Sequence, residues 1–362
     1  MAERLLFTAA AAFESARRID ELPQGHRASR LHGHGFVARV RAAPASNWTL
    51  PGAEATRLRE QLERCVEPLD YRLLNEQVEA PTDENLARWV KSRLDVPGIE
   101  LIGLRSTPSQ GVDLGRNDRC HLWRRYRFEA AHRLPNVAPG HKCARMHGHG
   151  FEVALHAELG PARDSRFDAE ALDRHWAPLG AEFHHTCLND IAGLANPTSE
   201  MIASTIWGRL KPSLPELSWV TVHETATCGA HFDGERYRIW TELALDSALS
   251  LKRVAAEDPR RRVHGHTYGL RLHLSAPLDQ VLGWTVDFGD VKQIFSPIFL
   301  KLDHQPLHEL PGIEDNDVAS LARWIRAQVV PALPALSRID LYETPDCGAI
   351  LAWGQDEPAL PV

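Results

Sequence analysis

Two histidines flank a single glycine in the stretch HKCARMHGHGFEV (residues 141–153), and a lone cysteine stands four residues before the first of them. The same His-Gly-His triplet recurs at residues 32–34 and 264–266, so three copies lie at nearly equal intervals along the 362 residues. The cysteine accompanies the middle copy alone. A repeated core with one distinctive copy predicts a triplicated fold in which one repeat differs in function.

Other landmarks repeat in step with the triplets. After each triplet come a stretch with a Leu-Asp or Phe-His pair, a helical stretch and a closing β-like run. The chain is therefore expected to hold three tandem domains, residues 1–121, 122–243 and 244–362. No Gly/Ser-rich linker separates them, so we expect the repeats to pack directly against one another.

Within a domain the pattern predicts strand, strand, helix, helix, strand, strand. The runs FEVALHAEL and YGLRLHLSA alternate apolar and polar residues, which is typical of an antiparallel sheet with one solvated face. The helical stretches carry apolar residues at three- and four-residue spacing after polar caps such as Thr198-Ser199. The predicted fold class is α+β: three ββααββ units whose sheets close into one antiparallel β-barrel, with the helices outside.

The middle triplet has the pattern of a metal site. Two histidines at i and i+2 of a strand point to the same face, because strand side chains alternate. A catalytic zinc site usually has three protein ligands and one open position. His132, on the preceding predicted strand, supplies the third, so the sequence predicts zinc bound by His132, His147 and His149.

The other two domains lack this set. Alignment of the three strands places Arg17 in the first domain and Lys252 in the third at the position of His132. A cation in place of a ligand repels a metal ion, so we expect no zinc in these domains. Their histidine pairs are then expected to bond to backbone or water.

Cys143 lies on the predicted loop that enters the metal strand. A zinc ion nearby would lower the pKa of the thiol, which could then act as a base or nucleophile near neutral pH. The alternative is a buried, inert cysteine. Ala28 and Arg260 occupy the matching positions of the other domains, so the cysteine accompanies the one complete histidine set. That coincidence favours the functional interpretation.

Four segments of the middle domain, FEAAHRL, GHKCARMHGHGF, CLNDIAGLANPTSE and VHETATCGA, resemble 6-carboxytetrahydropterin synthase and its relative 6-pyruvoyltetrahydropterin synthase. The resemblance covers residues 126–240 well, is weaker in the third domain and is weakest in the first. It implies the tunnelling fold (T-fold), whose single units trimerise into a twelve-stranded barrel and stack as hexamers. A fused triplet then corresponds to one covalent pseudo-trimer, and the expected assembly is a homodimer of pseudo-trimers.

The resemblance also assigns roles to residues of this sequence. It implies a zinc ion on the three histidines, with Cys143 as the catalytic base and His185 as the family's catalytic histidine. It assigns substrate binding to Glu224, Thr198 and Ser199. A carboxylate suits this task because it can accept two parallel N–H bonds from the edge of an amino-pyrimidinone ring. Without the surrounding motif, Glu224 would be read as a surface carboxylate of a strand.

The middle domain departs from the family at two points that the third domain preserves. The expected Asp-His pair reads His184-His185, whereas the third domain keeps Asp303-His304. The element Val-Asp-Phe reads Arg-Phe-Asp at residues 166–168, whereas the third domain keeps it at residues 286–288. We therefore hypothesise a composite site in which Asp303 and His304 act with Cys143. In the alternative, His185 acts within its own domain.

The first domain is expected to be structural. It has Arg105-Ser106 where Glu-Thr is expected and Tyr71 in place of the histidine, although it keeps Pro81-Thr82. In the third domain, the run at residues 260–262 is three arginines, which either meet a triphosphate or form a solvated basic loop.

The resemblance implies a zinc-dependent lyase that converts 7,8-dihydroneopterin triphosphate to 6-carboxy-5,6,7,8-tetrahydropterin, releasing acetaldehyde and triphosphate, in 7-deazapurine (queuosine-type) biosynthesis. One alternative is 6-pyruvoyltetrahydropterin formation, in which triphosphate alone is eliminated. Another is a binding module for pterins or purines that has lost turnover.

Composition argues against two classes of partner, nucleic acid and membrane, and leaves the small-molecule pterin triphosphate implied by the resemblance. A net charge of −7 argues against a broad nucleic-acid surface, and no apolar run is long enough to span a membrane. The apolar start of the chain is expected to be a strand, not an export signal, because its first residues lack net positive charge. Six scattered cysteines without a C-x-x-C pair suit a reducing compartment, so we expect a cytoplasmic protein.

Overall fold

The structure is a computed structural model that describes residues 3–22, 25–160, 168–279, 282–313 and 315–354. It divides into two compact parts. The larger part contains residues 1–118, 242–272 and 289–361, and the smaller part contains residues 119–241 and 273–288. Two residues of the rearranged Arg-Phe-Asp element, Arg166 and Phe167, lie outside the described ranges.

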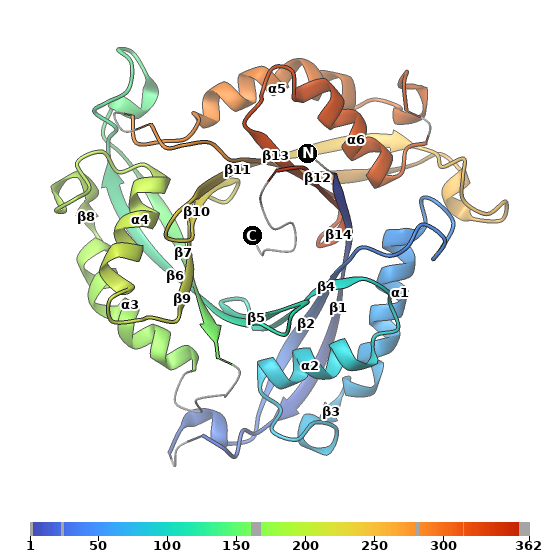
Figure 1. The fold of residues 1–362 in the computed structure, drawn as a ribbon, viewed down its shortest axis with the longest axis horizontal. Coiled ribbons are helices and arrows are strands. Elements are labelled where there is room, and N and C mark those ends of the chain that lie inside the picture. The colour runs from blue at the N-terminus through green and yellow to red at the C-terminus, as the bar shows by residue number, and fades with distance from the viewer. Residues whose placement is uncertain (1–2, 23–24, 161–167, 280–281, 314, 355–362) are drawn as a thin grey trace. The chain divides into compact units, whose positions relative to one another are not determined.

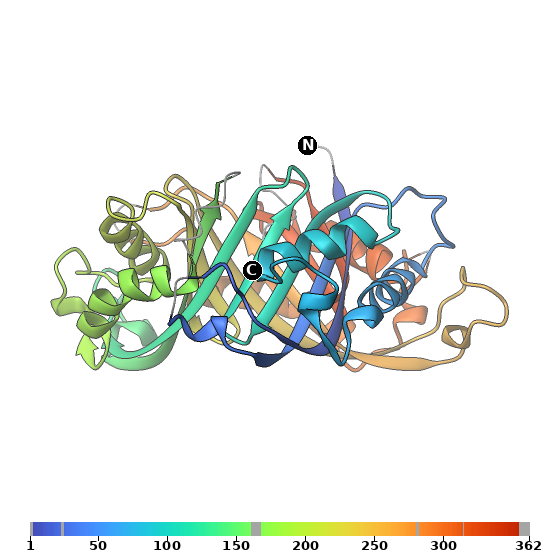
Figure 2. The ribbon, with the colours of Figure 1, turned by 90° about the horizontal axis from the view of Figure 1, so that it is seen from below.

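The larger part holds the first repeat and most of the third. The first repeat comprises β1 (Arg4–Arg17), β2 (His32–Ala42), α1 (Glu54–Val66), β3 (Arg72–Leu73), α2 (Asp83–Arg93), β4 (Ile99–Thr107) and β5 (Gln110–Gly115). The third comprises β11 (Tyr237–Leu249), β12 (His264–Leu274), α5 (Phe288–Leu302), α6 (Val318–Val329), β13 (Leu336–Thr344) and β14 (Cys347–Ala352). Helices α1 and α2 lie on one face of the sheet formed by β1, β2 and β4 (Figures 1 and 2).

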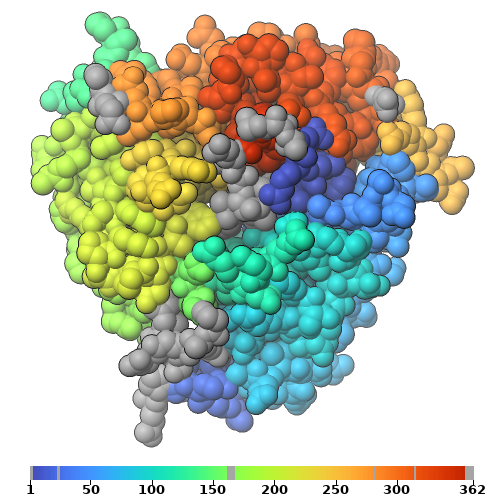
Figure 3. All heavy atoms as spheres, viewed as in Figure 1, coloured from blue at the N-terminus to red at the C-terminus, as the bar shows by residue number. Residues whose placement is uncertain are grey.

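The long strands of the larger part pair antiparallel, and the two-residue β3 pairs parallel with β1. The core rows come from alternating side chains. Strand β1 pairs with β2 so that Phe13 faces Phe36, and the two rings stack with their centroids 5.0 Å apart. On its other side β1 pairs with β14, with Arg4 opposite Ala352. This pairing joins the first and third repeats and leaves β1 without a free edge. In Figure 3, the helices of the first repeat, coloured blue to cyan, form part of the molecular surface.

The smaller part carries the second repeat. Its elements are β6 (Cys120–His132), β7 (His147–Leu159), α3 (Ala169–Phe183), β8 (Thr186–Cys187), α4 (Ser199–Leu210), β9 (Leu217–Thr225) and β10 (Cys228–Phe232). The strand order is β10-β9-β7-β6, and β6 and β7 form a hairpin in which His132 faces His147. Beneath the hairpin, the ring of Phe128 stacks on Phe151 and meets Phe183 edge-on. This packing fixes the strands that carry the histidines.

The predicted order of strand, strand, helix, helix, strand, strand is found in every repeat, and the α+β fold class is confirmed. A shared backbone detail shows the repetition at atomic scale. Tyr71, His185 and His304 all have positive φ, between 51° and 59°. The N–H of each donates a 2.6 Å hydrogen bond to a carbonyl of its own repeat's first strand. No helix among the described residues is long and apolar enough to cross a membrane.

Two alignments made from the sequence are wrong by a few residues. Strand β11 ends at Leu249, which has no exposed surface and occupies the position of His132; Lys252 lies beyond the strand. The bridge between Ala248 and Pro306 matches that between Ala131 and Cys187, which fixes this register. The conclusion that the third repeat lacks a third histidine is unchanged, but an apolar side chain, and no cation, replaces it.

The second correction concerns the first repeat. Thr107 pairs with Gln110 in the way that Thr225 pairs with Cys228. Ser106 therefore stands at the position of Glu224, and the equivalent of the Glu-Thr pair is Ser106-Thr107, one residue later than Arg105-Ser106.

Candidate metal centre and active site

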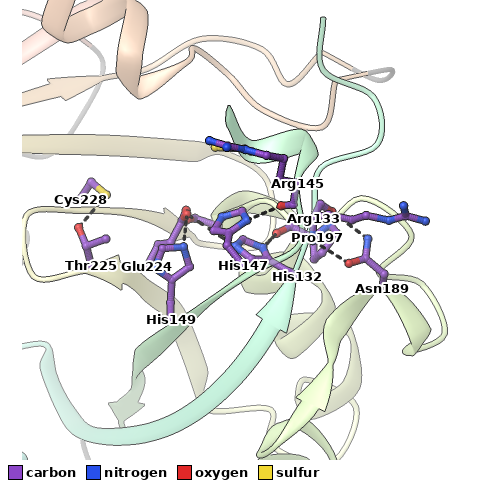
Figure 4. Close-up of polar contacts among 12 residues, drawn as sticks. His132, Arg133, Arg145, His147, His149, Asn189, Pro197, Glu224, Thr225 and Cys228 are labelled. Atoms are coloured by element: carbon purple, nitrogen blue, oxygen red, sulfur yellow. Dashed lines mark hydrogen bonds and ion pairs between the residues drawn. The ribbon is translucent and has the colours of Figure 1, made fainter. Parts of the chain in front are cut away.

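Three histidines and one carboxylate converge at the end of the β6–β7 hairpin (Figure 4). The ligand atoms of His132, His147, His149 and Glu224 all lie within 4.8 Å of one another. His132 is buried, with 1% of its side chain exposed, and the other three are partly exposed. The three predicted histidine ligands are thus brought together by the antiparallel register, in which His132 of β6 faces His147 of β7.

The backbone orients two of these rings toward a common point. Nδ1 of His132 bonds to the carbonyl of Pro197 at 2.9 Å, and Nδ1 of His147 bonds to that of Arg145 at 2.8 Å. Each bond directs Nε2 inward and fixes the tautomer that a metal ligand needs. Nε2 of His132 is buried without a hydrogen-bond partner among the described residues, whereas Nε2 of His149 lies 3.2 Å from Oε1 of Glu224.

This donor set fits a divalent transition metal. Buried imidazole nitrogens without partners are costly, and a cation held by all three would satisfy them. Three imidazole ligands with room for a fourth are typical of catalytic zinc. Burial, with repulsion from His147 and His149, lowers the pKa of His132, so the neutral ring that binds metal is favoured.

Glu224 lies beside the cluster at the end of β9. Its Oε1 is 3.2 Å from Nε2 of His149 and 3.9 Å from Nε2 of His132, and its Oε2 accepts a 2.9 Å bond from Ser199 Oγ. Burial alone would raise the pKa of Glu224, but its contacts with His149, His132 and Ser199 outweigh burial and lower it. The carboxylate is therefore ionised and available to a ligand or to the metal.

The two residues at the start of α4 have different surroundings. Thr198 caps the helix by accepting a 3.2 Å bond from Met201 N–H, and its hydroxyl donates to the carbonyl of Gly283. The Thr198 hydroxyl is therefore engaged in hydrogen bonds within the protein. Ser199 points to Glu224 and holds the carboxylate in place. Their substrate-binding role stays a prediction.

Cys143 is half-buried on a short 3-10 turn, Lys142–Ala144, that precedes β7. Burial, followed by the negative charge of Glu224 and of Asp287, raises the pKa of the Cys143 thiol. The protein alone therefore disfavours the thiolate, and the lowered pKa expected from the sequence requires a cation bound at the histidines.

Two residues beside Cys143, His141 and Asp287, were not predicted from the sequence as site residues. Oδ2 of Asp287 lies 3.2 Å from Nε2 of His141, the residue that caps the turn carrying Cys143. Asp287 is the central residue of the Val-Asp-Phe element of the third repeat, so that repeat does contribute to the smaller part. The sequence signal that could have indicated Asp287 was the Val-Asp-Phe element, which is intact in the third repeat and rearranged in the second.

Neither His185 nor His304, the predicted proton-transfer histidines, belongs to the group of four candidate ligands. His185 is exposed, stacks on His184 at 3.7 Å, and has Glu129 as its nearest carboxylate at 4.0 Å. In the larger part, Nδ1 of His304 is 2.8 Å from Oδ2 of Asp303, which raises the pKa of His304. His184 makes the same backbone contact as Asp303: its Nδ1 accepts a hydrogen bond from Glu129 N–H, and Oδ1 of Asp303 accepts one from Asp246 N–H. The catalytic roles of His185, Asp303 and His304 stay predictions.

The equivalent position of the first repeat holds an internal cation. Arg17 is buried and donates to Oδ1 of Asp83 at 2.7 Å and to the carbonyl of Pro81 at 2.9 Å. Ser106 donates to Oδ2 of the same carboxylate at 2.6 Å. In the third repeat, Arg260 replaces the cysteine and bonds to Asp258 at 2.7 Å. The guanidinium of Arg260 is bonded to its own turn and to Thr56. Its contact with a triphosphate stays a prediction.

Fold and site together define an enzyme of the tunnelling-fold class, in which repeated two-helix sheets carry a histidine cluster. The model of the 6-pyruvoyl tetrahydropterin synthase family matches residues 7–106, 121–235 and 238–352, and the chain belongs to this family of pterin lyases. The resemblance drawn from the middle domain, and the prediction of an enzyme, are confirmed at this level.

Curated relatives each correspond to one repeat. A 6-carboxy-5,6,7,8-tetrahydropterin synthase from Synechocystis sp. is 35% identical over 123 residues, which are 32% of this chain and 94% of that protein. A dihydroneopterin monophosphate aldolase from Pyrococcus furiosus is 26% identical over 119 residues, 32% of this chain and 97% of that protein. Among solved structures, Caenorhabditis elegans 6-pyruvoyl tetrahydropterin synthase gives a TM-score of 0.30 at 16% identity, covering 33% of this chain and 95% of that chain.

Proposed function

We propose that the chain is a zinc-dependent lyase that converts 7,8-dihydroneopterin triphosphate and water to 6-carboxy-5,6,7,8-tetrahydropterin, acetaldehyde and triphosphate, in 7-deazapurine (queuosine-type) biosynthesis. The observation that carries the proposal is the convergence of His132, His147 and His149, with the buried Nε2 of His132 lacking a hydrogen-bond partner among the described residues and Cys143 on the adjoining turn. The name of the 35% identical relative supports the same product.

Each side chain has a defined task in this proposal. Zinc, when bound, polarises the oxygen atoms of the substrate side chain and lowers the pKa of groups beside it. Cys143 takes a proton from the substrate side chain once its thiol is ionised. The carboxylate of Glu224, kept ionised by its neighbours, accepts the N–H groups of the pterin edge. A second proton passes through His185 or through the Asp303-His304 pair.

The relatives bear names of different reactions, so the product has to be measured. The alternatives are 6-pyruvoyltetrahydropterin formation, with triphosphate as the one small product, and ligand binding without turnover. We also propose that two chains pair as a homodimer of pseudo-trimers. All six cysteines are free, which suits a reducing compartment such as the cytoplasm.

The test is incubation of the zinc-loaded protein with 7,8-dihydroneopterin triphosphate, with Cys143→Ala as the matched control. We expect stoichiometric acetaldehyde and 6-carboxytetrahydropterin from the unmodified protein and a loss of at least about a hundredfold in rate for the variant. Triphosphate without acetaldehyde would select the pyruvoyl-type reaction. Binding without either product would reduce the protein to a pterin-binding module.

A further inference from the structure

The turn that carries Cys143 is fixed by a histidine side chain. His141 caps the turn, and its Nδ1 accepts a 3.2 Å hydrogen bond from the N–H of Cys143. A neutral imidazole that accepts at Nδ1 carries its proton on Nε2. That Nε2 lies 3.2 Å from Oδ2 of Asp287, so the geometry makes it a donor to the carboxylate. The chain of contacts runs from Asp287 through the imidazole to the backbone of the cysteine.

Asp287 reaches this place because residues 282–287 are anchored to the start of α4 by contacts that do not involve its side chain. Asn196 Nδ2 donates to the carbonyl of Leu282 at 2.6 Å, and Thr285 N–H donates to Oε1 of Glu200 at 2.8 Å. Glu200 is buried, so this bond is shielded from water. Removing the Asp287 carboxylate therefore leaves the segment attached.

Gly283 makes the close approach of the segment possible. Its φ is +71°, and an added Cβ would lie 2.9 Å from Nδ2 of Asn196. The hydroxyl of Thr198 donates to its carbonyl. A side chain at this position would be strained by the positive φ and would crowd the amide of Asn196.

We infer that Asp287, a residue of the third repeat, is a positioning residue that holds the His141 tautomer and thereby the turn and thiol of Cys143 in the second repeat. The inference deepens the proposed function, since it assigns a residue to the same site. A catalytic group must be held within a fraction of an ångström of its working position, and a rotatable cap does this when its far nitrogen is also bonded. It also gives the third repeat a role through Asp287 that does not require Asp303 or His304.

The test compares Asp287→Asn, His141→Asn and the double variant, with Glu216→Gln as a control for loss of an exposed carboxylate of the same part. Asparagine at residue 141 can still cap the turn but has no nitrogen placed to meet Asp287. We expect each single variant to lower kcat by between about ten- and a hundredfold, with KM within about threefold. The double variant is expected to be no worse than the poorer single one, because both remove one contact.

A second readout does not depend on turnover. Hydrogen exchange of the peptide containing residues 141–147 is expected to accelerate in Asp287→Asn and to return toward the original rate in Asp287→Glu, while zinc content stays unchanged. Additive losses in the double variant, or unchanged exchange in Asp287→Asn, would overturn the inference. If the unmodified protein makes no product, the exchange data still decide the positioning role, so failure of the proposed function is distinguishable from failure of this inference.

Discussion

The first and second repeats hold the same pair of groups, a carboxylate and a hydroxyl, on exchanged elements. In the second, the carboxylate sits on β9 as Glu224 and the hydroxyl sits at the start of α4 as Ser199. In the first, the two are exchanged: the hydroxyl is Ser106 on β4 and the carboxylate is Asp83 at the start of α2. Both repeats thus place a hydrogen-bonded carboxylate–hydroxyl pair next to the side chain of Arg17 or His132, and Asp83 is buried whereas Glu224 is partly exposed.

The source of the positive charge differs. In the first repeat the guanidinium of Arg17 provides it, bonded to Asp83 and to a proline carbonyl. In the second, His132 bonds to the corresponding proline carbonyl and leaves Nε2 without a partner. The first repeat therefore supplies its cation from its own sequence, whereas the second leaves a nitrogen available to the metal ion proposed above.

The largest expected effect is on metal content. His147→Ala is expected to reduce bound zinc to background, because two imidazoles hold the ion weakly. His264→Ala, at the equivalent place of the third repeat, is expected to leave zinc unchanged, since Leu249 there offers no ligand. Metal analysis of both purified variants measures this directly. Zinc loss in both, or in neither, would contradict the assignment of the metal to the second repeat.

The next effect is on stability. Arg17→Met is expected to destabilise the protein by about 3–5 kcal/mol, because Asp83 would be left buried without its cation. Arg18→Met is the control, since Arg18 is exposed and pairs with exposed Asp20; a change within about 0.5 kcal/mol is expected. Thermal unfolding with zinc content monitored separates the two. Equal shifts would show that the first repeat does not depend on its internal cation.

The smallest expected effect concerns the third repeat, where Glu343 stands at the position of Glu224. Burial raises the pKa of Glu343 to about 7 from an ordinary value of 4.5. Between these values the folded protein binds more protons than the unfolded one, so stability falls as pH rises through that window, by about 1–3 kcal/mol.

Glu343→Gln is expected to flatten this dependence in unfolding measured between pH 4.5 and 8. Some slope is expected to remain, because burial also raises the pKa of Glu200 to about 7. An unchanged slope would mean that Glu343 keeps an ordinary pKa. The pKa of Glu224 is lowered, so its contribution to the free energy of unfolding increases as pH rises. The equivalent glutamates of the second and third repeats therefore change stability with pH in opposite directions.

The sequence was sufficient for features set by local periodicity. Strand alternation placed His147 and His149 on one face, and the short return from the preceding strand placed His132 opposite them. The internal repeat could have given Leu249, because Leu249 precedes its triplet by the spacing that separates His132 from His147. The alignment was wrong because it matched Lys252-Arg253 to His132-Arg133, which shifted the register.

Contacts between segments distant in sequence were not predictable in this way. The meeting of His141 with Asp287 depends on how residues 282–287 lie against α4, which no periodicity records. The exchange of carboxylate and hydroxyl between Ser106 and Asp83 likewise needs the true strand register. The sequence could place each group on its element and could pair two strands adjacent in the chain, but it could not pair segments that are distant in sequence.

The pairing of β14 with β1 brings the beginning and the end of the described chain onto neighbouring strands, with Arg4 opposite Ala352. The first and third repeats are therefore neighbours within one sheet although they are the farthest apart along the chain. Three identical subunits must all accept the same substitution, whereas each copy in a fused chain can change without the others.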